Sequence, residues 1–189
     1  MSLIDRYFPD LTPRQREQFA AMPDLYREWN ARINVVSRKD IDHIEEHHIL
    51  HSLAIARTGL IVPGESVLDV GCGGGFPGIP LAVFYPDVQF TLVDSIGKKI
   101  RVVQEVATAL GLTNVRAEHS RVEQLDGGRS RFDWVVSRAV TTYGIIYLKG
   151  GDLDAEIAAA GRQTEQLPVS TWFAGEFFET KKVLVLPKK

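Results

Sequence analysis

The chain has 189 residues and a mass of 21.1 kDa, with 44% hydrophobic residues, 24% charged residues, a net charge of −2 and a pI near 6.2. This composition predicts a globular chain with one sizeable core, and it excludes collagenous, mucin-like and wholly disordered proteins. The single cysteine excludes a disulfide framework and any zinc site built from several cysteines. Because the sequence shows neither an apolar leader nor an apolar run of about 20 residues, we expect a cytoplasmic protein without membrane contact.

The first part of the chain, residues 1–60, is predicted to be a helical extension. Thr12-Pro13-Arg14-Gln15 is a capping box, with a hydroxyl N-cap, a proline at the first helical position and a glutamine three residues after the cap. Apolar residues then recur at helical spacing, and Pro23 predicts a kink or a break between two helices. A second helix is predicted from Ile41 to Arg57, and Thr58-Gly59 is a reasonable stop for it.

From residue 66 onward the pattern changes to alternating strands and helices. Strands are predicted at 66–70, 88–93, 115–118 and 132–136, helices at 79–85 and 98–110, and a short turn or helix at 122–125. This alternation predicts an α/β fold with a parallel sheet and helices on its faces. We assign residues 61–189 to this second unit.

The C-terminal part contains three further β-prone stretches, at 145–148, 171–173 and 182–186. The last two are joined by Ala174-Gly175-Glu176, which predicts an antiparallel edge hairpin that completes the sheet. Too few residues separate the strand ending at 136 from the one beginning at 145 for the usual parallel crossover, which takes a dozen or more residues. Either these two strands are antiparallel, or a connecting segment is missing from the sequence.

A glycine-rich loop, Asp69-Val70-Gly71-Cys72-Gly73-Gly74-Gly75, follows the first predicted strand and precedes a helix. Without side chains, its backbone can turn tightly and approach a cofactor closely. Residues 73–78 also fit the G-x-G-x-x-G pattern of dinucleotide-binding proteins, with Asp94 at about the usual distance. However, the turn begins earlier, at Gly71, and an acidic residue there suits a cationic cofactor better than a pyrophosphate. The loop therefore favours S-adenosylmethionine over a nicotinamide dinucleotide, with Asp94 accepting from the ribose hydroxyls, while a purely structural turn remains the alternative.

Several motifs occur in order over most of residues 25–150. The two most specific are G-F-P-G-I-P at residues 75–80 and Ser120-Arg121-Val122-Glu123. The others are Trp29-Asn30, Asn34-Val35-Val36-Ser37, His48-Ile49-Leu50, Val93-Asp94-Ser95, Gly97-Lys98-Lys99, Ser137-Arg138-Ala139 and Leu148-Lys149-Gly150. Together they resemble the bacterial small-subunit rRNA guanine-N7 methyltransferases, the RsmG or GidB family.

This resemblance implies a Rossmann-like class I S-adenosylmethionine-dependent methyltransferase with an N-terminal helical extension, which methylates N7 of a guanine in 16S rRNA. Combined with the glycine loop, it gives the cofactor-binding set Asp69, Gly71, Gly73, Gly75, Phe76, Asp94, Ser95, Val122, Glu123 and Arg138. Within that set, similarity places the ribose against Asp94 and Ser95 and the adenine near Val122 and Glu123. Similarity also makes Arg138 and Arg121 the candidate catalytic residues, and Lys98, Arg121 and Lys149 the candidate RNA-binding residues.

Two features depart from the family pattern. His51 stands where family members usually carry aspartate, which changes either the packing or the polar role of that position. Family members also have about 20 more residues, the length of a crossover unit, near the short connection between Val140 and Ile145. We therefore predict that a segment near residues 140–145 is missing from the sequence.

The charge distribution is compatible with RNA binding. Residues 95–150 contain nine Lys or Arg residues and five Asp or Glu residues, a difference of +4, although the whole chain is slightly acidic. A local basic surface of this kind fits phosphate contacts, whereas a chain that binds nucleic acid over its whole surface would be more basic. We expect 16S rRNA or a small-subunit ribosomal particle as partner, no DNA, and a monomer.

Histidine and cysteine patterns suggest further chemistry that we do not favour. His43-Ile44-Glu45-Glu46-His47 fits the H-x-x-E-H pattern of one class of zinc hydrolases, but no other carboxylate cluster offers an evident third ligand. We therefore expect a partly exposed helix face and no metal. Cys72 has no evident partner for nucleophilic catalysis. The alternatives to methyl transfer are a nicotinamide-dependent oxidoreductase and an RNA-binding module without activity.

Overall fold

The computed structural model describes residues 2–125, 132–137, 145–151, 157 and 163–186. The chain begins with helix α1 (Leu3–Tyr7) and the long helix α2 (Pro13–Arg32). The predicted capping box opens α2, because Thr12 Oγ1 accepts from the Gln15 amide at 3.3 Å while the Gln15 side chain accepts from the Thr12 amide at 2.9 Å.

The break predicted at Pro23 is wrong, because α2 continues through it. An internal proline removes one hydrogen bond of the helix and costs about 3 kcal/mol in a solvent-exposed helix. Here Met22, directly before the proline, and Tyr26, one turn after Met22 on the same face, are fully buried. Packing of this apolar face therefore outweighs the local cost of the proline.

The helix predicted over residues 41–57 is a series of short segments with different hydrogen-bonding patterns. A 3-10 turn, η1 (Ile41–His43), is followed by the π-helical segment η2 (Glu45–Leu50), the α-helical turn α3 (His51–Leu53) and another 3-10 turn, η3 (Ala56–Thr58). The predicted stop is confirmed, since Gly59 adopts a left-handed conformation with φ of 67°.

A seven-stranded sheet forms the centre of the molecule. Its strands are β1 (Ser66–Val70), β2 (Gln89–Asp94), β3 (Val115–His119), β4 (Trp134–Ser137), β5 (Ile145–Gly150), β6 (Glu165–Pro168) and β7 (Lys181–Leu186). The order across the sheet is β3-β2-β1-β4-β5-β7-β6. Strands β1 to β5 pair in parallel, and β7 runs antiparallel to both of its neighbours. The predicted mostly parallel α/β fold with an antiparallel C-terminal hairpin is confirmed.

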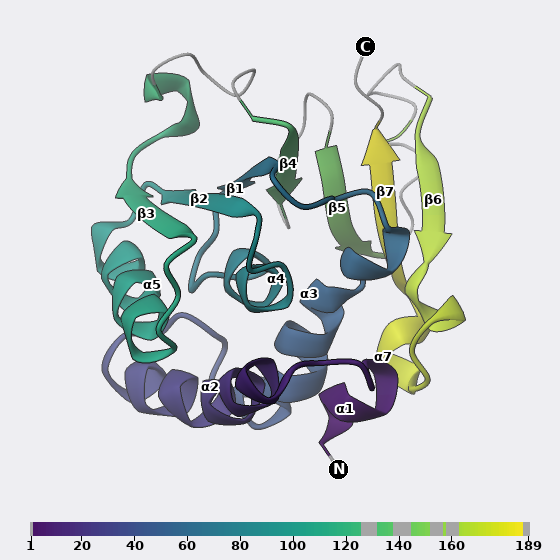
Figure 1. Ribbon diagram of the computed structural model, residues 1–189, viewed down its shortest axis with the longest axis horizontal. Helices are drawn as coiled ribbons and strands as arrows, with labels where there is room; N and C mark the ends of the chain where they lie inside the picture. The colour runs from purple at the N-terminus through teal and green to yellow at the C-terminus, as the bar shows by residue number, and fades with distance from the viewer. Residues whose placement is uncertain (1, 126–131, 138–144, 152–156, 158–162, 187–189) are drawn as a thin grey trace.

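Helices α4 (Gly78–Phe84) and α5 (Gly97–Ala109) connect the first three strands, close to their predicted positions. Together with α2 and α3 they lie on one side of the sheet (Figure 1). The described residues outside the sheet that pack on its other side are Val122 of η4 (Val122–Gln124), Leu125, Phe132 and Ile157. Among the described residues, no helix combines the length and the apolar character needed to cross a bilayer.

The direction of β5 settles one of the two readings of the short connection. Strands β4 and β5 are parallel, with Val135 opposite Ile145 and Ser137 opposite Tyr147, so the antiparallel reading is wrong. The seven residues 138–144 lie between them in the sequence and outside the described residues. A parallel connection of this length is shorter than the usual crossover, which is consistent with the missing segment that we predict there.

The C-terminal hairpin is built from different residues than predicted. Residues 169–171 form a 3-10 turn, η6 (Val169–Thr171), and α7 (Glu176–Glu179) follows, so the strand predicted at 171–173 is wrong. Val169, Phe173 and Phe178 are buried in the core, and their apolar character reflects this burial rather than a strand. The edge strand is instead β6, which is mostly exposed.

The helical extension and the sheet share a single hydrophobic core. Its buried residues include Ile4 and Phe19 from the first helices, Ile49 and Leu53 from the π and α segments, and Phe90 from the sheet. The boundary that we predict near residue 60 therefore separates two stretches of sequence that are packed together in the structure.

Candidate cofactor-binding site

The glycine loop lies at the carboxyl end of β1, the edge at which parallel α/β sheets bind their ligands. Gly71, Gly73 and Gly75 have φ values of 65°, 58° and 100°, which side-chain-bearing residues rarely adopt. A Cβ atom added at Gly71 or Gly73 would meet no atom within 4 Å. These two glycines thus present bare backbone to open space, as close approach of a cofactor requires.

The remaining glycines of the loop face protein instead. A Cβ atom at Gly74 would lie 2.8 Å from Val35 Cβ, and one at Gly75 would lie 2.7 Å from Ile79 Cγ1. At Gly78, the first residue of α4, it would lie 2.7 Å from the Leu92 side chain. We predicted that Gly75 contacts the cofactor, but a side chain at this position would project into the packed side of the loop.

Two carboxylates hold the loop in this shape. Asp94, at the end of β2, accepts from the Gly73 amide at 2.9 Å through Oδ2 and from the Ile96 amide at 2.8 Å through Oδ1. Asp69, which is fully buried on β1, accepts from the Gly78 amide at 2.8 Å. Both predicted acidic residues are thus brought to the loop, and each ties its backbone to a neighbouring element.

The N-terminal extension supports the loop from behind. The Tyr26 hydroxyl of α2 donates to the Gly74 carbonyl at 2.7 Å, and its ring packs on Phe76 with the centroids 4.5 Å apart. The His48 ring lies on Phe76 as well, with a centroid distance of 5.2 Å. Phe76, predicted to contact the cofactor, is 1% exposed, so its ring lies in the core and supports the loop. The sequence motifs included His48 and Val35, but they did not indicate that either residue would contact the loop.

The ends of the neighbouring strands add two residues that we did not predict. The His119 ring at the end of β3 hydrogen-bonds through Nε2 with the Ser95 carbonyl at 3.0 Å and lies against Gly97. Ser137, at the end of β4, is buried, and its hydroxyl donates to the Val70 carbonyl at 3.0 Å. The register of the parallel strands places these residues at the same edge as the loop, which single motifs in the sequence do not reveal.

Cys72 is enclosed within the loop. Its side chain is 1% exposed, and burial, followed by the nearby charges of Asp69 and Asp94, raises the pKa of its thiol well above the ordinary value of 9.0. A protonated, inaccessible thiol is a poor nucleophile, which agrees with the absence of a nucleophilic role expected from the sequence.

The other predicted site residues are distributed around this edge. Ser95, just before α5, and Lys98, in its first turn, are exposed. Arg121, just before η4, and Glu123, within it, are also exposed, whereas Val122 is buried against the sheet. Lys149 is partly exposed on β5, with its ammonium 5.9 Å from the centre of the Tyr147 ring. Arg138 lies outside the described residues.

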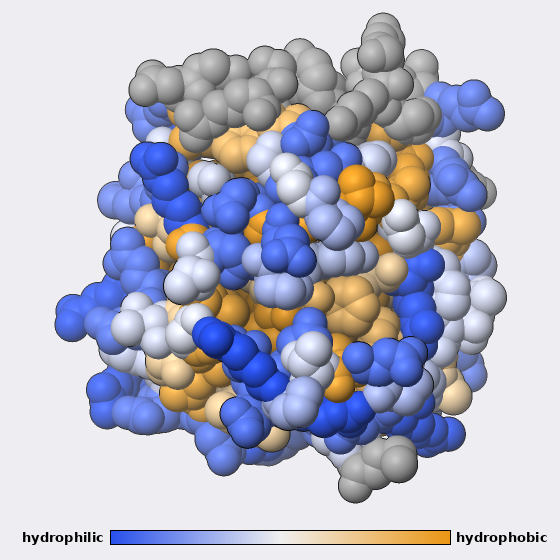
Figure 2. All heavy atoms as spheres, viewed as in Figure 1, coloured by the Kyte–Doolittle hydropathy of each residue, from blue (hydrophilic) through white to orange (hydrophobic). Residues whose placement is uncertain are grey.

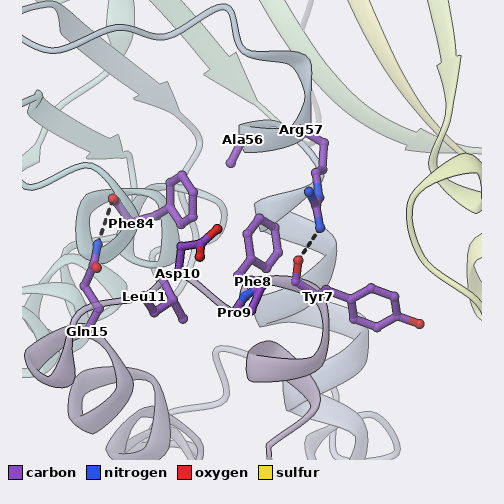
Figure 3. A pocket seen from close by; sticks show the side chains of 9 residues that line it. All are labelled: Tyr7, Phe8, Pro9, Asp10, Leu11, Gln15, Ala56, Arg57 and Phe84. Carbon is purple, nitrogen blue, oxygen red and sulfur yellow. Dashed lines mark hydrogen bonds between the residues drawn. The ribbon is translucent and has the colours of Figure 1, made fainter.

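A separate cavity of about 370 Å³ lies where the N-terminal extension meets the far end of α4 (Figure 3). The aromatic rings of Phe8 and Phe84 line it, together with Arg57, which donates to the Tyr7 carbonyl. Phe84 ends α4, whereas the glycine loop leads into its start. This cavity is thus distinct from the predicted cofactor site.

Comparison with known proteins identifies the family. A family model described as rRNA small subunit methyltransferase G (GidB) matches residues 15–160. The chain belongs to this family. A ribosomal RNA small subunit methyltransferase G of Cytophaga hutchinsonii is 47% identical over 208 aligned positions, which cover 99% of each chain. One of Bacteroides thetaiotaomicron is 50% identical over 205 positions, which cover 97% of this chain and 98% of the relative.

Solved structures confirm the methyltransferase fold. A SAM-dependent methyltransferase of Aquifex aeolicus superimposes with a TM-score of 0.52 at 14% identity, covering 71% of this chain and 88% of the other. A 16S rRNA methyltransferase of T. thermophilus, in complex with AdoMet and guanosine, gives a TM-score of 0.54 at 19% identity, covering 82% of this chain and 44% of the other. The resemblance to the GidB family that the sequence motifs indicated is thus confirmed, and so is the fold that it implied.

Proposed function

We propose that the protein transfers a methyl group from S-adenosylmethionine to N7 of a guanine in 16S rRNA. The observation that carries this proposal is the match to the methyltransferase G family over nearly the whole chain. The glycine loop, with its open side at the carboxyl edge of the sheet, supports it independently.

The residues of the loop fit the proposed cofactor. Gly71 and Gly73 leave room beside the backbone that any side chain would fill. Asp94 uses one lone pair of each oxygen on backbone amides, and a carboxylate has about four acceptor positions, so it can also accept from the two ribose hydroxyls. The negative charges of Asp69 and Asp94 suit a cofactor that carries a sulfonium and an ammonium and has no phosphate.

The chemistry requires little from the protein beyond placement. S-adenosylmethionine supplies an electrophilic methyl group, and guanine N7 carries a free lone pair at neutral pH, so no general base is needed. The side chains would act by aligning N7 with the methyl group and by excluding water. Arg121 and Arg138 would position the base or an adjacent phosphate, and Lys98 and Lys149 would hold the RNA backbone. We further propose that the protein is a cytoplasmic monomer that does not act on DNA.

The decisive experiment is methyl transfer from tritiated cofactor to 16S rRNA prepared from a strain that lacks this enzyme, followed by mapping of the modified base. We expect label at N7 of one guanine. RNA binding without transfer of label would support a non-enzymatic module instead. Calorimetric titration with S-adenosylmethionine and with NAD(H) separates the two cofactors, and tight NAD(H) binding alone would contradict the proposal.

The role of Arg138 is tested by replacing it. The Arg138→Ala variant should lose most of its methyl transfer. A native rate of transfer would show that this assignment is wrong.

A further inference from the structure

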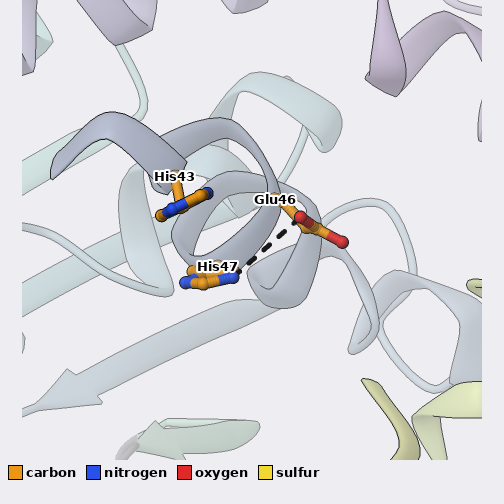
Figure 4. A group of neighbouring side chains, drawn as sticks. All are labelled: His43, Glu46 and His47. Atoms are coloured by element: carbon orange, nitrogen blue, oxygen red, sulfur yellow. Dashed lines mark ion pairs between the residues drawn. The ribbon is translucent and has the colours of Figure 1, made fainter. Parts of the chain in front are cut away.

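The helical segment around residues 41–51 contains a cluster of possible metal ligands that lies apart from the glycine loop. His43, Glu46 and His47 each offer one donor atom, and these three atoms lie within 4.8 Å of one another. The two imidazole rings are stacked, with centroids 4.8 Å apart, and Glu46 reaches toward them from one side (Figure 4). From this geometry we propose that His43, Glu46 and His47 form a binding site for a divalent transition metal such as Zn²⁺.

The orientation of His47 favours metal binding. Its Nδ1 is 2.5 Å from Asp40 Oδ1, and its Nε2 lies on the other side of the ring, 4.0 Å from Glu46 Oε2. In metal sites, a ligating histidine commonly donates its second N–H to a carboxylate, which fixes the tautomer and makes the ligating nitrogen more basic. Asp40 is already in that position, so Nε2 is the nitrogen left to bind the metal.

The His47 ring is also held rigidly in place. It lies between the His43 ring and the ring of Phe177 from α7, whose centroid is 3.9 Å away at an interplanar angle of 12°. His43 is exposed and contacts the His47 ring on one face, so its side chain can rotate out of this stack toward a bound ion. One side of the site is therefore pre-organised while the other can close.

The distances require a small adjustment. Zinc bonds of about 2.0–2.2 Å place tetrahedral ligand atoms about 3.4 Å apart, so atoms of the cluster that are separated by up to 4.8 Å must approach one another by up to about 1.4 Å. The His43 side chain is exposed and the Glu46 side chain is partly exposed, so rotation about their side-chain bonds is the movement we expect on metal binding. Two imidazole nitrogens, one carboxylate oxygen and a water molecule form a donor set that suits Zn²⁺ and does not suit Mg²⁺.

This site differs from the zinc hydrolase suggested by the H-x-x-E-H pattern. In those enzymes the glutamate of the motif acts as a base beside the metal, and a third ligand comes from elsewhere in the protein. Here Glu46 itself is the third ligand. The expected role is to clamp the junction between η1 and η2, where the helix changes its hydrogen-bonding pattern, and the expectation of no metal from the sequence is revised accordingly.

Calorimetric titration of ZnCl₂ into the tag-free, chelator-treated full-length protein tests the proposal. We expect one Zn²⁺ per chain, no measurable binding of MgCl₂, and a rise in the unfolding temperature when zinc is added, because a ligand that binds the folded state stabilises it. Failure to bind zinc, or equal binding of magnesium, would overturn the proposal.

Three variants locate the site. His43→Asn, which removes an exposed ligand without disturbing the core, and His47→Gln should each weaken zinc binding more than tenfold and abolish the rise in unfolding temperature. His119→Asn removes an imidazole outside the cluster and should bind zinc as the unaltered protein does. Unchanged affinity in His43→Asn, or an equal loss in His119→Asn, would place the metal elsewhere and contradict the assignment. Circular dichroism confirms that each variant is folded.

Discussion

The two sides of the glycine loop use the same residue type for different purposes. On one side, Gly71 and Gly73 face open space in a left-handed conformation. On the other side, Gly74 of the loop and Gly78, which opens α4 just after it, lie so close to Val35 and Leu92 that no side chain fits. One side therefore leaves room for a ligand, and the other allows the N-terminal extension and the sheet to pack against the loop.

This difference shows that a run of glycines does not define a binding surface by itself. The packed side of the loop contacts Tyr26 of α2, Val35 in the segment after α2, and Leu92 of β2. These contacts hold the open side in a fixed shape. Most of the molecular surface seen in Figure 2 is polar, with scattered apolar residues among the polar ones. Because packing fixes the shape of the loop, we expect cofactor recognition to depend on this shape as well as on the exposed atoms of the loop.

Overpacking the packed side should have the largest effect on stability. In Gly78→Ala the new methyl group would lie 2.7 Å from Leu92 Cγ and Cδ2 and 2.8 Å from Asp69 Oδ2, which are all buried. We expect a loss of about 2–3 kcal/mol in the free energy of unfolding, measured by urea denaturation. A loss below that of Gly71→Ala would contradict the distinction between the two sides.

On the open side, Gly71→Ala should separate stability from binding. The methyl group meets no atom, so the expected cost is the strain of a left-handed alanine, about 1–2 kcal/mol. Because the methyl group projects into the proposed cofactor space, calorimetry should show at least a tenfold weaker affinity for S-adenosylmethionine. Unchanged affinity would show that the cofactor does not approach this part of the loop.

The support from α2 can be weakened without changing the packing of rings. Tyr26→Phe keeps the contact with Phe76 but removes the hydrogen bond to the buried Gly74 carbonyl. The expected loss is about 1 kcal/mol in unfolding free energy, with a higher KM for the cofactor and little change in kcat. If KM stays the same while stability falls, the loop does not depend on this support.

His48 contacts Phe76 beside the loop and is hydrogen-bonded to Asp40. The contribution of Asp40 to stability can be measured by unfolding the protein at different pH values. Burial raises the pKa of Asp40, but hydrogen bonds with His47 and His48 outweigh this and hold the pKa below the ordinary 3.8. A lowered pKa in the folded state stabilises the protein above the pKa of the unfolded chain, and this stability is lost as the pH falls through the folded value. In urea denaturation, Asp40→Asn should therefore be less stable than the unaltered protein above about pH 5, and the difference should shrink below about pH 4. A constant difference in unfolding free energy between the two proteins across this pH range would contradict the lowered pKa of Asp40.

The smallest effect is expected when the folded protein is treated with a reagent that alkylates Cys72. With its raised pKa and its burial inside the loop, the thiol should not react with iodoacetamide at pH 8 in the folded protein, and it should react once urea unfolds the chain. Rapid modification of the folded protein would indicate that the loop opens to solvent.

The sequence predicted the central part of the fold well because its signals are local. The strands that become β1, β2 and β3 and the helices α4 and α5 lie within one or two residues of their predicted bounds. Short apolar runs, the glycine turn and Gly111, which follows α5 with a φ of 63°, define these elements without reference to the rest of the chain.

Predictions that depended on distant contacts were less successful. Phe173 is buried against the rings of Tyr7 and Phe178, so its hydrophobicity did not indicate a strand. Strand β6 was missed because its residues are polar and it is defined by pairing with β7. At the site, Asp69, Gly71, Gly73 and Asp94 were predicted, whereas the contact of Tyr26 with the loop spans 48 residues and has no local signature.

The missing segment near residues 140–145 remains a prediction. The alignment with the Cytophaga relative has 208 positions, at least 19 more than the 189 residues of this chain. An intact mass of 21.1 kDa for the natural protein would contradict it.

The contact between Tyr7 and the C-terminal segment has a consequence for synthesis. The Tyr7 hydroxyl accepts from the Ala174 amide at 2.9 Å, and its ring packs on Phe173 with centroids 5.0 Å apart. Ala174 is translated 167 residues after Tyr7, whereas Glu45 of η2, which accepts from the Leu3 amide of α1, follows much sooner. Contacts of such long sequence separation form slowly, so the face of Tyr7 that packs on Phe173 stays uncovered until the segment around Ala174 has been translated.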